Sequence, residues 1–136
     1  MIQILDASVV LKWFLEEPGT DHALLIKQQY ERNEISIVAP DLLIYELANV
    51  LRYKKSFTEH GIKTAIKSLY DLRINFIAPT LSIMEEALAL SVKNNLSVYD
   101  CVYVALAKKL SSIFITADKK LYLQIRAQLG QKIILL

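Results

Sequence analysis

Short apolar runs of four or five residues recur along the chain and alternate with longer stretches of mixed polarity. Each run is rich in Ile, and polar residues or Pro bound it. Runs of this length and composition are typical of buried β-strands. The predicted strands are Ile2–Leu5, Ile35–Ala39, Ile74–Ala78, Ile113–Thr116 and Lys132–Leu135.

The stretches between these runs carry apolar residues at helical spacing. The predicted helices are Val9–Leu15, Asp21–Arg32, Leu42–Tyr53, Thr58–Leu72, Leu81–Asn94, Val98–Leu110 and Lys119–Leu129. Thr80 and Ser97 precede two of them and are predicted N-caps. Alternating strands and helices predict an α/β fold, with a parallel sheet of about five strands flanked by about seven helices. No linker or repeat divides the sequence, so residues 1–136 are predicted to form a single domain.

The composition is apolar for a chain of this length, with 54% hydrophobic residues and a mean hydropathy of +0.32. No apolar run approaches the ~20 residues of a membrane-spanning helix. We therefore expect no membrane association, and we expect an oligomer or a bound partner to cover the additional apolar surface. The lone Cys101 has no partner for an internal disulfide, and Met1–Leu5 leads directly into Asp6 without a basic leader. Both features predict a cytoplasmic protein.

Carboxylates follow two of the predicted strands closely. Asp6 comes after Ile2–Leu5, and Asp118 comes shortly after Ile113–Thr116. Ligands of open parallel sheets bind beyond the carboxyl ends of the strands. Glu46, early in the helix after the second strand, and Asp100, in the first turn of Val98–Leu110, are expected near the same edge.

Each of these acids also has a structural interpretation. Asp6 and Asp118 could cap the helices that follow them, and Ser97-x-x-Asp100 has the pattern of a capping box. Glu46 could be a solvated helix residue, although its neighbours are apolar. Four carboxylates at one edge would repel one another without a cation. Oxygen-only ligands select hard ions such as Mg²⁺ or Mn²⁺.

Such a cluster predicts metal-dependent hydrolysis of a phosphodiester, in which the ions orient and activate a water and neutralise charge on the phosphate. No other catalytic set is present in the sequence. Ser8 has no nearby His to act as its base, and three scattered glycines form neither a P-loop nor a dinucleotide-binding motif. The net charge of +2 is compatible with this substrate without indicating it.

Four stretches around these acids resemble a known family, the PIN domains, and specifically the VapC-type toxins of prokaryotic toxin–antitoxin pairs. They occur in the order typical of that family and span nearly the whole chain. The stretches are Leu5-Asp6-Ala7-Ser8 through Phe14, Ala39 through Leu51 around Glu46, Leu96 through Ala107 around Asp100, and Ile115-Thr116-Ala117-Asp118.

The resemblance implies a sheet whose first and fourth strands are neighbours, Mg²⁺- or Mn²⁺-dependent cleavage of RNA, a homodimer, and inhibition by a cognate antitoxin. By position in the motifs, the implied metal ligands are Asp6, Glu46, Asp100 and Asp118. Ser8, Asn49 and Thr116 are the residues implied to hold them in place. The chain departs from some relatives after Asp118, where Lys119 and Lys120 stand instead of a further acid.

Two other functional classes remain open at this stage. A PIN-fold module without catalysis would act through protein binding, and an intact set of four acids argues against it. A phospho-acceptor domain would need paired acids after the first strand, where this chain has Asp6-Ala7-Ser8.

The aromatic and basic residues also have two interpretations. Trp13, Phe14 and the tyrosines could stack on unpaired bases, but residues at helical spacing more often belong to the core or to an interface. Basic residues could follow a phosphate backbone or form a solvated face. These are Arg52, Lys54, Lys55, Lys119 and Lys120.

Overall fold

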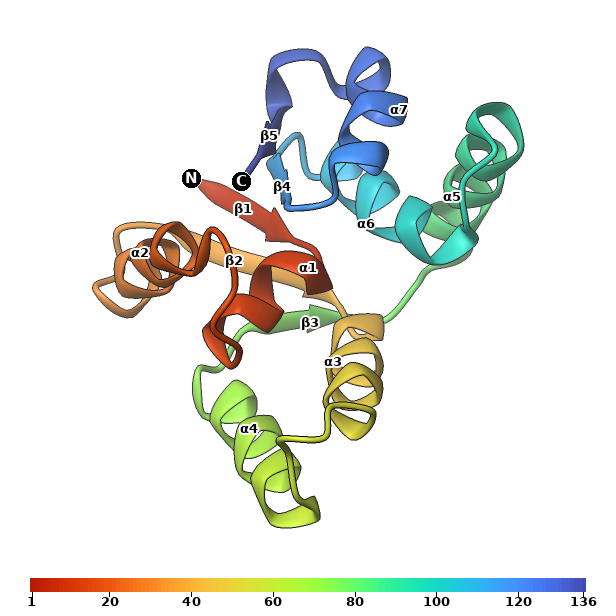
Figure 1. Cartoon of the computed structure of the whole chain (residues 1–136). Helices are drawn as coiled ribbons and strands as arrows, with labels where there is room; N and C mark the ends of the chain where they lie inside the picture. The colour runs from red at the N-terminus through yellow and green to blue at the C-terminus, as the bar shows by residue number, and fades with distance from the viewer.

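The computed structural model describes residues 1–136 as five strands, seven α-helices and two short 3₁₀ turns (Figure 1). The strands are β1 (Ile2–Leu5), β2 (Ser36–Pro40), β3 (Asn75–Ile77), β4 (Ile113–Thr116) and β5 (Ile133–Leu135). The helices are α1 (Ala7–Val10), α2 (Thr20–Glu31), α3 (Leu42–Arg52), α4 (Glu59–Asp71), α5 (Leu81–Asn94), α6 (Val98–Lys109) and α7 (Lys119–Leu129). The 3₁₀ turns are η1 (Leu11–Trp13) and η2 (Gly130–Lys132).

All five strands are parallel, and their order in the sheet is β3-β2-β1-β4-β5. The chain moves from β1 to β2 on one side and returns to β4 on the other. The boundary between β1 and β4 is therefore the switch point of the sheet, where open α/β proteins bind their ligands. Leu5 pairs with Ile115 across this boundary, so the carboxyl ends of β1 and β4 lie next to each other.

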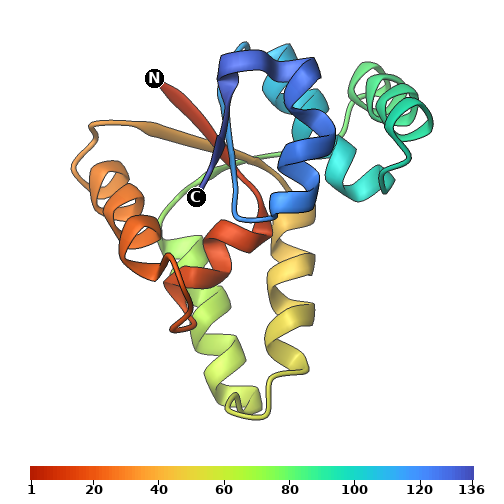
Figure 2. The ribbon, with the colours of Figure 1, turned by 45° about the horizontal axis from the view of Figure 1, so that its top comes forward.

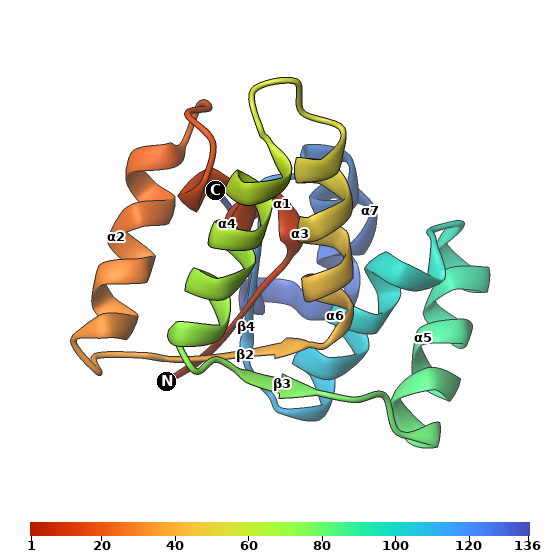
Figure 3. The same cartoon turned by 90° about the horizontal axis from the view of Figure 1, so that it is seen from below.

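The helices cover the sheet in distinct groups. Helices α3 and α4 pack against each other as a long pair on one side, and α1 lies between α3 and the end of β1 (Figure 2). Helix α6 packs on β1, β2 and β4, whereas α5 packs along α6 at the outside of the molecule (Figure 3). None of the helices combines the length and apolar character required to cross a lipid bilayer.

Helix α6 is enclosed between the sheet and α5. All seven residues from Cys101 to Ala107 are buried, which explains why this helix has apolar residues on every side. Helix α3, in contrast, buries one stripe, formed by Leu43, Leu47 and Leu51. Interiors are packed as densely as organic crystals, so the enclosure of α6 fixes the position of its first turn, which carries Asp100.

Most predicted elements agree with the structure, and four of them (β1, β4, α5 and α7) have the predicted bounds. Thr80 and Ser97 are N-caps as predicted, since their hydroxyls accept hydrogen bonds from Ile83 N and Asp100 N. The predicted helix Val9–Leu15 was wrong in its extent. Because Asp6 caps the chain immediately after β1, α1 begins at Ala7, and it tightens into η1 after one turn. Lys132, predicted in the last strand, belongs to η2 instead.

Candidate active site

Asp6 lies at the switch point, between the end of β1 and the start of α1. Its side chain is almost completely buried, with 6% of its surface exposed. One carboxylate oxygen accepts a hydrogen bond from Ser8 Oγ and caps α1 by accepting from Val9 N at 3.4 Å, while the other accepts from Thr116 Oγ1 at 2.5 Å. Burial raises the pKa of Asp6 to about 6, and these hydrogen bonds oppose that rise.

The hydroxyls of Ser8 and Thr116 also connect β1 to the segment that follows β4. Thr116 is fully buried, and its Oγ1 accepts a hydrogen bond from Asp118 N at 3.0 Å. Ser8 Oγ accepts one from Ala117 N at 2.9 Å. A single pair of hydroxyls therefore holds the Asp6 carboxylate and fixes the backbone that carries Asp118.

Glu46 lies on α3 and is partly buried. Its Oε1 accepts a hydrogen bond at 2.7 Å from the hydroxyl of Tyr103, a buried residue of α6. Burial raises the pKa of Glu46, the hydrogen bond from Tyr103 opposes the rise, and the negative charges of Asp100 and Asp6 add to it. The charges of Asp100 and Asp6 act on Glu46, so all three lie in one electrostatic environment.

Asp100 and Asp118 border a hollow of about 220 Å³ between the first turns of α6 and α7, which Lys120 and Gln124 also line. Asp100 is partly buried. Burial raises its pKa, the Ser97 hydroxyl opposes this rise, and the charge of Asp118 contributes to it. Asp118 is exposed, and its Oδ1 caps α7 by accepting a hydrogen bond from Leu121 N at 3.1 Å.

The model of the PIN domain family matches residues 4–125 of the sequence. The chain belongs to the PIN-domain family. Among curated proteins, it is similar to "Ribonuclease VapC3" of Pyrobaculum aerophilum, with 27% identity over 126 residues that cover 87% of this chain and 90% of the relative.

Solved structures show the same PIN fold. A toxin–antitoxin complex from Klebsiella pneumoniae superposes with a TM-score of 0.66 at 16% identity, over 97% of this chain and 95% of that one. VapC20 of Mycobacterium tuberculosis, described as a toxin that cleaves the sarcin–ricin loop, superposes with a TM-score of 0.69 at 12% identity. That match covers 89% of this chain and 93% of the VapC20 chain.

The charges of the four acids of this PIN domain act on one another, but the side chains do not form a coordination shell. No three His, Cys, Asp or Glu side chains converge closely enough to ligate a common ion. Asp100 links the set, because its charge acts on both Asp6 and Glu46 and it is itself affected by Asp118. The donor chemistry fits a hard divalent cation.

The structure separates the two interpretations of each acid only in part. Asp6 and Asp118 are helix caps, as the structural interpretation predicted. The second oxygen of Asp118 accepts no hydrogen bond from the protein, and the oxygen of Asp6 that Thr116 contacts keeps a further lone pair. Capping and ligation are therefore compatible. Asn49 is exposed and, with Glu46, lines a second hollow, separate from the one beside Asp100 and Asp118. Its role in holding a metal ligand stays a prediction.

Tyr103 is a site residue that the sequence alone did not identify. It stands three residues after Asp100 on α6, a spacing that places both side chains on one face of the helix. That spacing is the signal by which it could have been found. The apolar residues around Tyr103 instead indicated a core position, and its ring is indeed buried in the core.

Replacing Tyr103 with Phe is expected to destabilise the protein in a pH-dependent way. The hydrogen bond from Tyr103 favours the charged form of Glu46. Its loss should lower the free energy of unfolding by about 1–2 kcal/mol above the raised pKa of Glu46, and by less as the pH falls through that pKa to pH 4. Urea denaturation on both sides of that pKa measures this. Tyr30→Phe is the matched control, because it removes a 2.8 Å bond to the neutral Leu72 carbonyl and its cost should not depend on pH. Equal pH dependence in the two variants would contradict the role of Tyr103.

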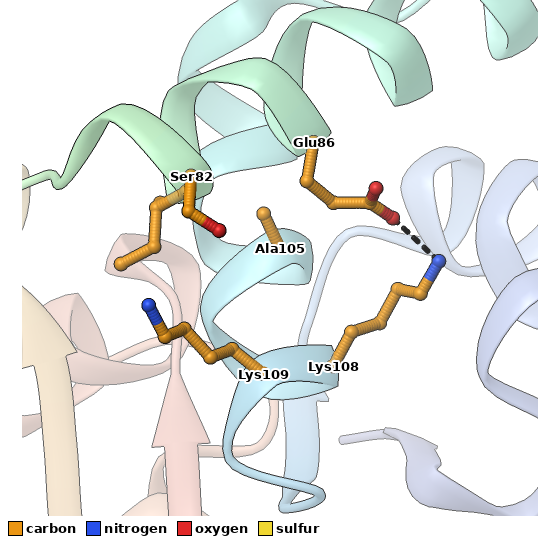
Figure 4. Close-up of a pocket in the computed structure, with 6 residues that line it drawn as sticks. Ser82, Glu86, Ala105, Lys108 and Lys109 are labelled. Atoms are coloured by element: carbon orange, nitrogen blue, oxygen red, sulfur yellow. Dashed lines mark hydrogen bonds and ion pairs between the residues drawn. The ribbon is translucent and has the colours of Figure 1, made fainter.

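A third hollow, of about 400 Å³, lies between α5 and α6 at the opposite end of α6 from Asp100 (Figure 4). Its one acid, Glu86, is paired with Lys108 at 2.5 Å. Lys109 also points into this hollow. With its only carboxylate neutralised in this way, the hollow lacks the acids needed for phosphodiester hydrolysis.

Proposed function

We propose that this PIN-domain protein is an endoribonuclease that uses Mg²⁺, or Mn²⁺ in its place, to cleave RNA phosphodiester bonds with an activated water. The observation that carries the proposal is the set of acids around the switch point. Burial and the charges of neighbouring acids raise the pKa values of Asp6, Glu46 and Asp100. The similarity to a curated ribonuclease supports RNA as the substrate.

The side chains have distinct roles in this proposal. Asp6, Glu46, Asp100 and Asp118 would hold the ions, which supply an activated water and neutralise charge on the phosphate. Ser8 and Thr116 orient Asp6, and Tyr103 orients Glu46. Lys120, beside Asp100 and Asp118, places a positive charge where the RNA backbone would pass.

We also propose that the protein is the toxin of a VapBC-type pair, acting in the cytoplasm as a homodimer that a cognate antitoxin inhibits. Similarity to a chain from a toxin–antitoxin complex supports the partner. Exposed apolar side chains on α5 provide surface for such contacts, since Leu81 is 76% exposed and Val92 is 85% exposed. Apolar patches on a protein surface often mark interaction sites.

The test is cleavage of single-stranded and stem–loop RNA by the purified protein. We expect cutting with Mg²⁺ or Mn²⁺ and no cutting in the presence of a chelator. Because water is the nucleophile, the products should carry 5′-phosphate and 3′-hydroxyl ends, which end-labelling and mass spectrometry identify.

Two results would contradict the proposal. Products with 2′,3′-cyclic phosphate ends would show that the 2′-hydroxyl of the RNA is the nucleophile. Absence of cleavage for every RNA and metal tested, in a protein that still binds a partner, would favour a PIN-fold module without catalysis.

A further inference from the structure

The exposed tyrosines of this protein are not equivalent. Of its seven tyrosines, Tyr30 and Tyr103 are fixed by hydrogen bonds from their hydroxyls, and Tyr122 packs against the core. Four are exposed: Tyr45, Tyr53, Tyr70 and Tyr99. Two of these four, Tyr45 on α3 and Tyr99 on α6, line the hollow that also contains Glu46.

This hollow has a volume of about 410 Å³, within the range of small-molecule sites. Tyr45 is 73% exposed and Tyr99 is 64% exposed, so both rings are open to solvent. Leu42 adds an apolar surface, and Asn49, whose side chain carries an amide, also lines the hollow. Glu46, one of the four acids of the candidate active site, forms part of the wall.

These features match the chemistry of an unpaired nucleobase. A base stacks on aromatic rings through its flat face, and an amide can both donate to and accept from its polar edge. In a duplex the bases are stacked and paired, and they cannot enter such a site. A protein side chain would fill the apolar part, but the shared wall with Glu46 places the hollow next to the proposed position of bond cleavage.

The geometry points to a base-binding site at Tyr45 and Tyr99, which takes an unpaired base next to the phosphate that is cleaved. This inference rests on the proposed ribonuclease function and adds to it the residues that hold a base of the RNA. Tyr45 and Tyr99 act as positioning residues, because they hold a base and do not contact the reacting phosphate.

The test measures binding separately from cleavage. Fluorescence anisotropy with a labelled single-stranded RNA, in chelator, gives the Kd of the intact protein. We expect Tyr45→Ala and Tyr99→Ala each to weaken binding by about 5-fold to 150-fold, the effect of losing one stacked base. Tyr45→Phe and Tyr99→Phe should bind as wild type does, because stacking needs the ring and not the hydroxyl. In metal-dependent cleavage, the Ala variants should raise KM with little change in kcat.

Tyr70→Ala is the control, since Tyr70 is exposed on α4 and lies outside this hollow. It should leave the Kd unchanged. If the Ala variants cleave and bind RNA as wild type does, the base-binding site is wrong and the ribonuclease function stands. If they change the mass measured by light scattering and leave the Kd for RNA unchanged, the hollow is a protein interface. Wild-type protein that binds single-stranded RNA in this tyrosine-dependent way but never cleaves it would overturn the function and keep the site.

Discussion

Replacement of Asp6 with Asn is expected to make the metal-free protein more stable at pH 7 while it reduces RNA cleavage by about 100-fold or more, the scale set by loss of one group that stabilises charge in a transition state. The buried carboxylate is costly to ionise, and Asn removes its charge with almost no change in shape. Loss of the same charge weakens the proposed ion site. A residue whose removal raises stability and abolishes activity is serving function at the expense of the fold.

The sign of the stability change follows from the raised pKa of Asp6. The folded chain holds the proton up to a pKa of about 6, whereas the ordinary value is 3.8. The favourable contribution of the protonated acid is complete below pH 3.8 and is lost as the pH rises through 6. The difference between these two pKa values corresponds to about 3 kcal/mol of folding free energy. The variant avoids this cost but forms an imperfect hydrogen bond to Ser8 or Thr116, which offsets about 1 kcal/mol of the gain.

Urea denaturation in chelator at pH 4 and pH 7 checks this result. The variant should gain stability relative to wild type as the pH rises. Mg²⁺ or Mn²⁺ is expected to stabilise the wild type by binding the folded state, and the variant should lose most of that gain. Asp21→Asn is the control, because Asp21 is exposed in the first turn of α2. A variant that is less stable at pH 7 in chelator and keeps the full effect of the metal would identify Asp6 as a helix cap alone.

The fold could be predicted from the sequence because its main signals are local. Apolar runs next to charged residues mark β1 and β4, and Thr80 and Ser97 mark where α5 and α6 begin. The order of the strands is not local. The resemblance to PIN domains implied one part of it, that the first and fourth strands are neighbours, and the pairing of β1 with β4 confirms that part.

The sequence predicted which acids belong to the site, but it did not predict the hydrogen bonds that hold them. The four acids are visible in the sequence because carboxylates follow strands and interrupt apolar helices. The hydrogen bond from Tyr103 to Glu46 joins residues 57 positions apart, and the spacing of apolar residues along the chain does not indicate such a contact. The length of α1 was also missed, because apolar spacing marks the buried Val9 and Val10 but not the residue at which a capped helix begins.

Replacement of Thr116 with Val is expected to destabilise the protein by about 2–4 kcal/mol, because two buried interactions are lost without any change in side-chain volume. Asp6 loses the hydrogen bond that Thr116 donates at 2.5 Å, and the backbone N–H of Asp118 loses its acceptor. The segment that carries Asp118 is then less firmly held. Cleavage should fall by about 10-fold to 100-fold, as it does when residues that orient metal ligands are removed.

Thr116→Ser tests the hydroxyl separately from the methyl group of the side chain. It keeps the hydroxyl and both hydrogen bonds, so it should retain most of the activity. The double variant Asp6→Asn, Thr116→Val then isolates the contact between the two residues. In the Asn background the charged acceptor is already gone, so Thr116→Val should cost about 1–2 kcal/mol less than it does in wild type. Urea denaturation of the four proteins measures this coupling. A cost of Thr116→Val that is the same in both backgrounds would show that Thr116 stabilises the end of β4 and does not hold Asp6 for catalysis.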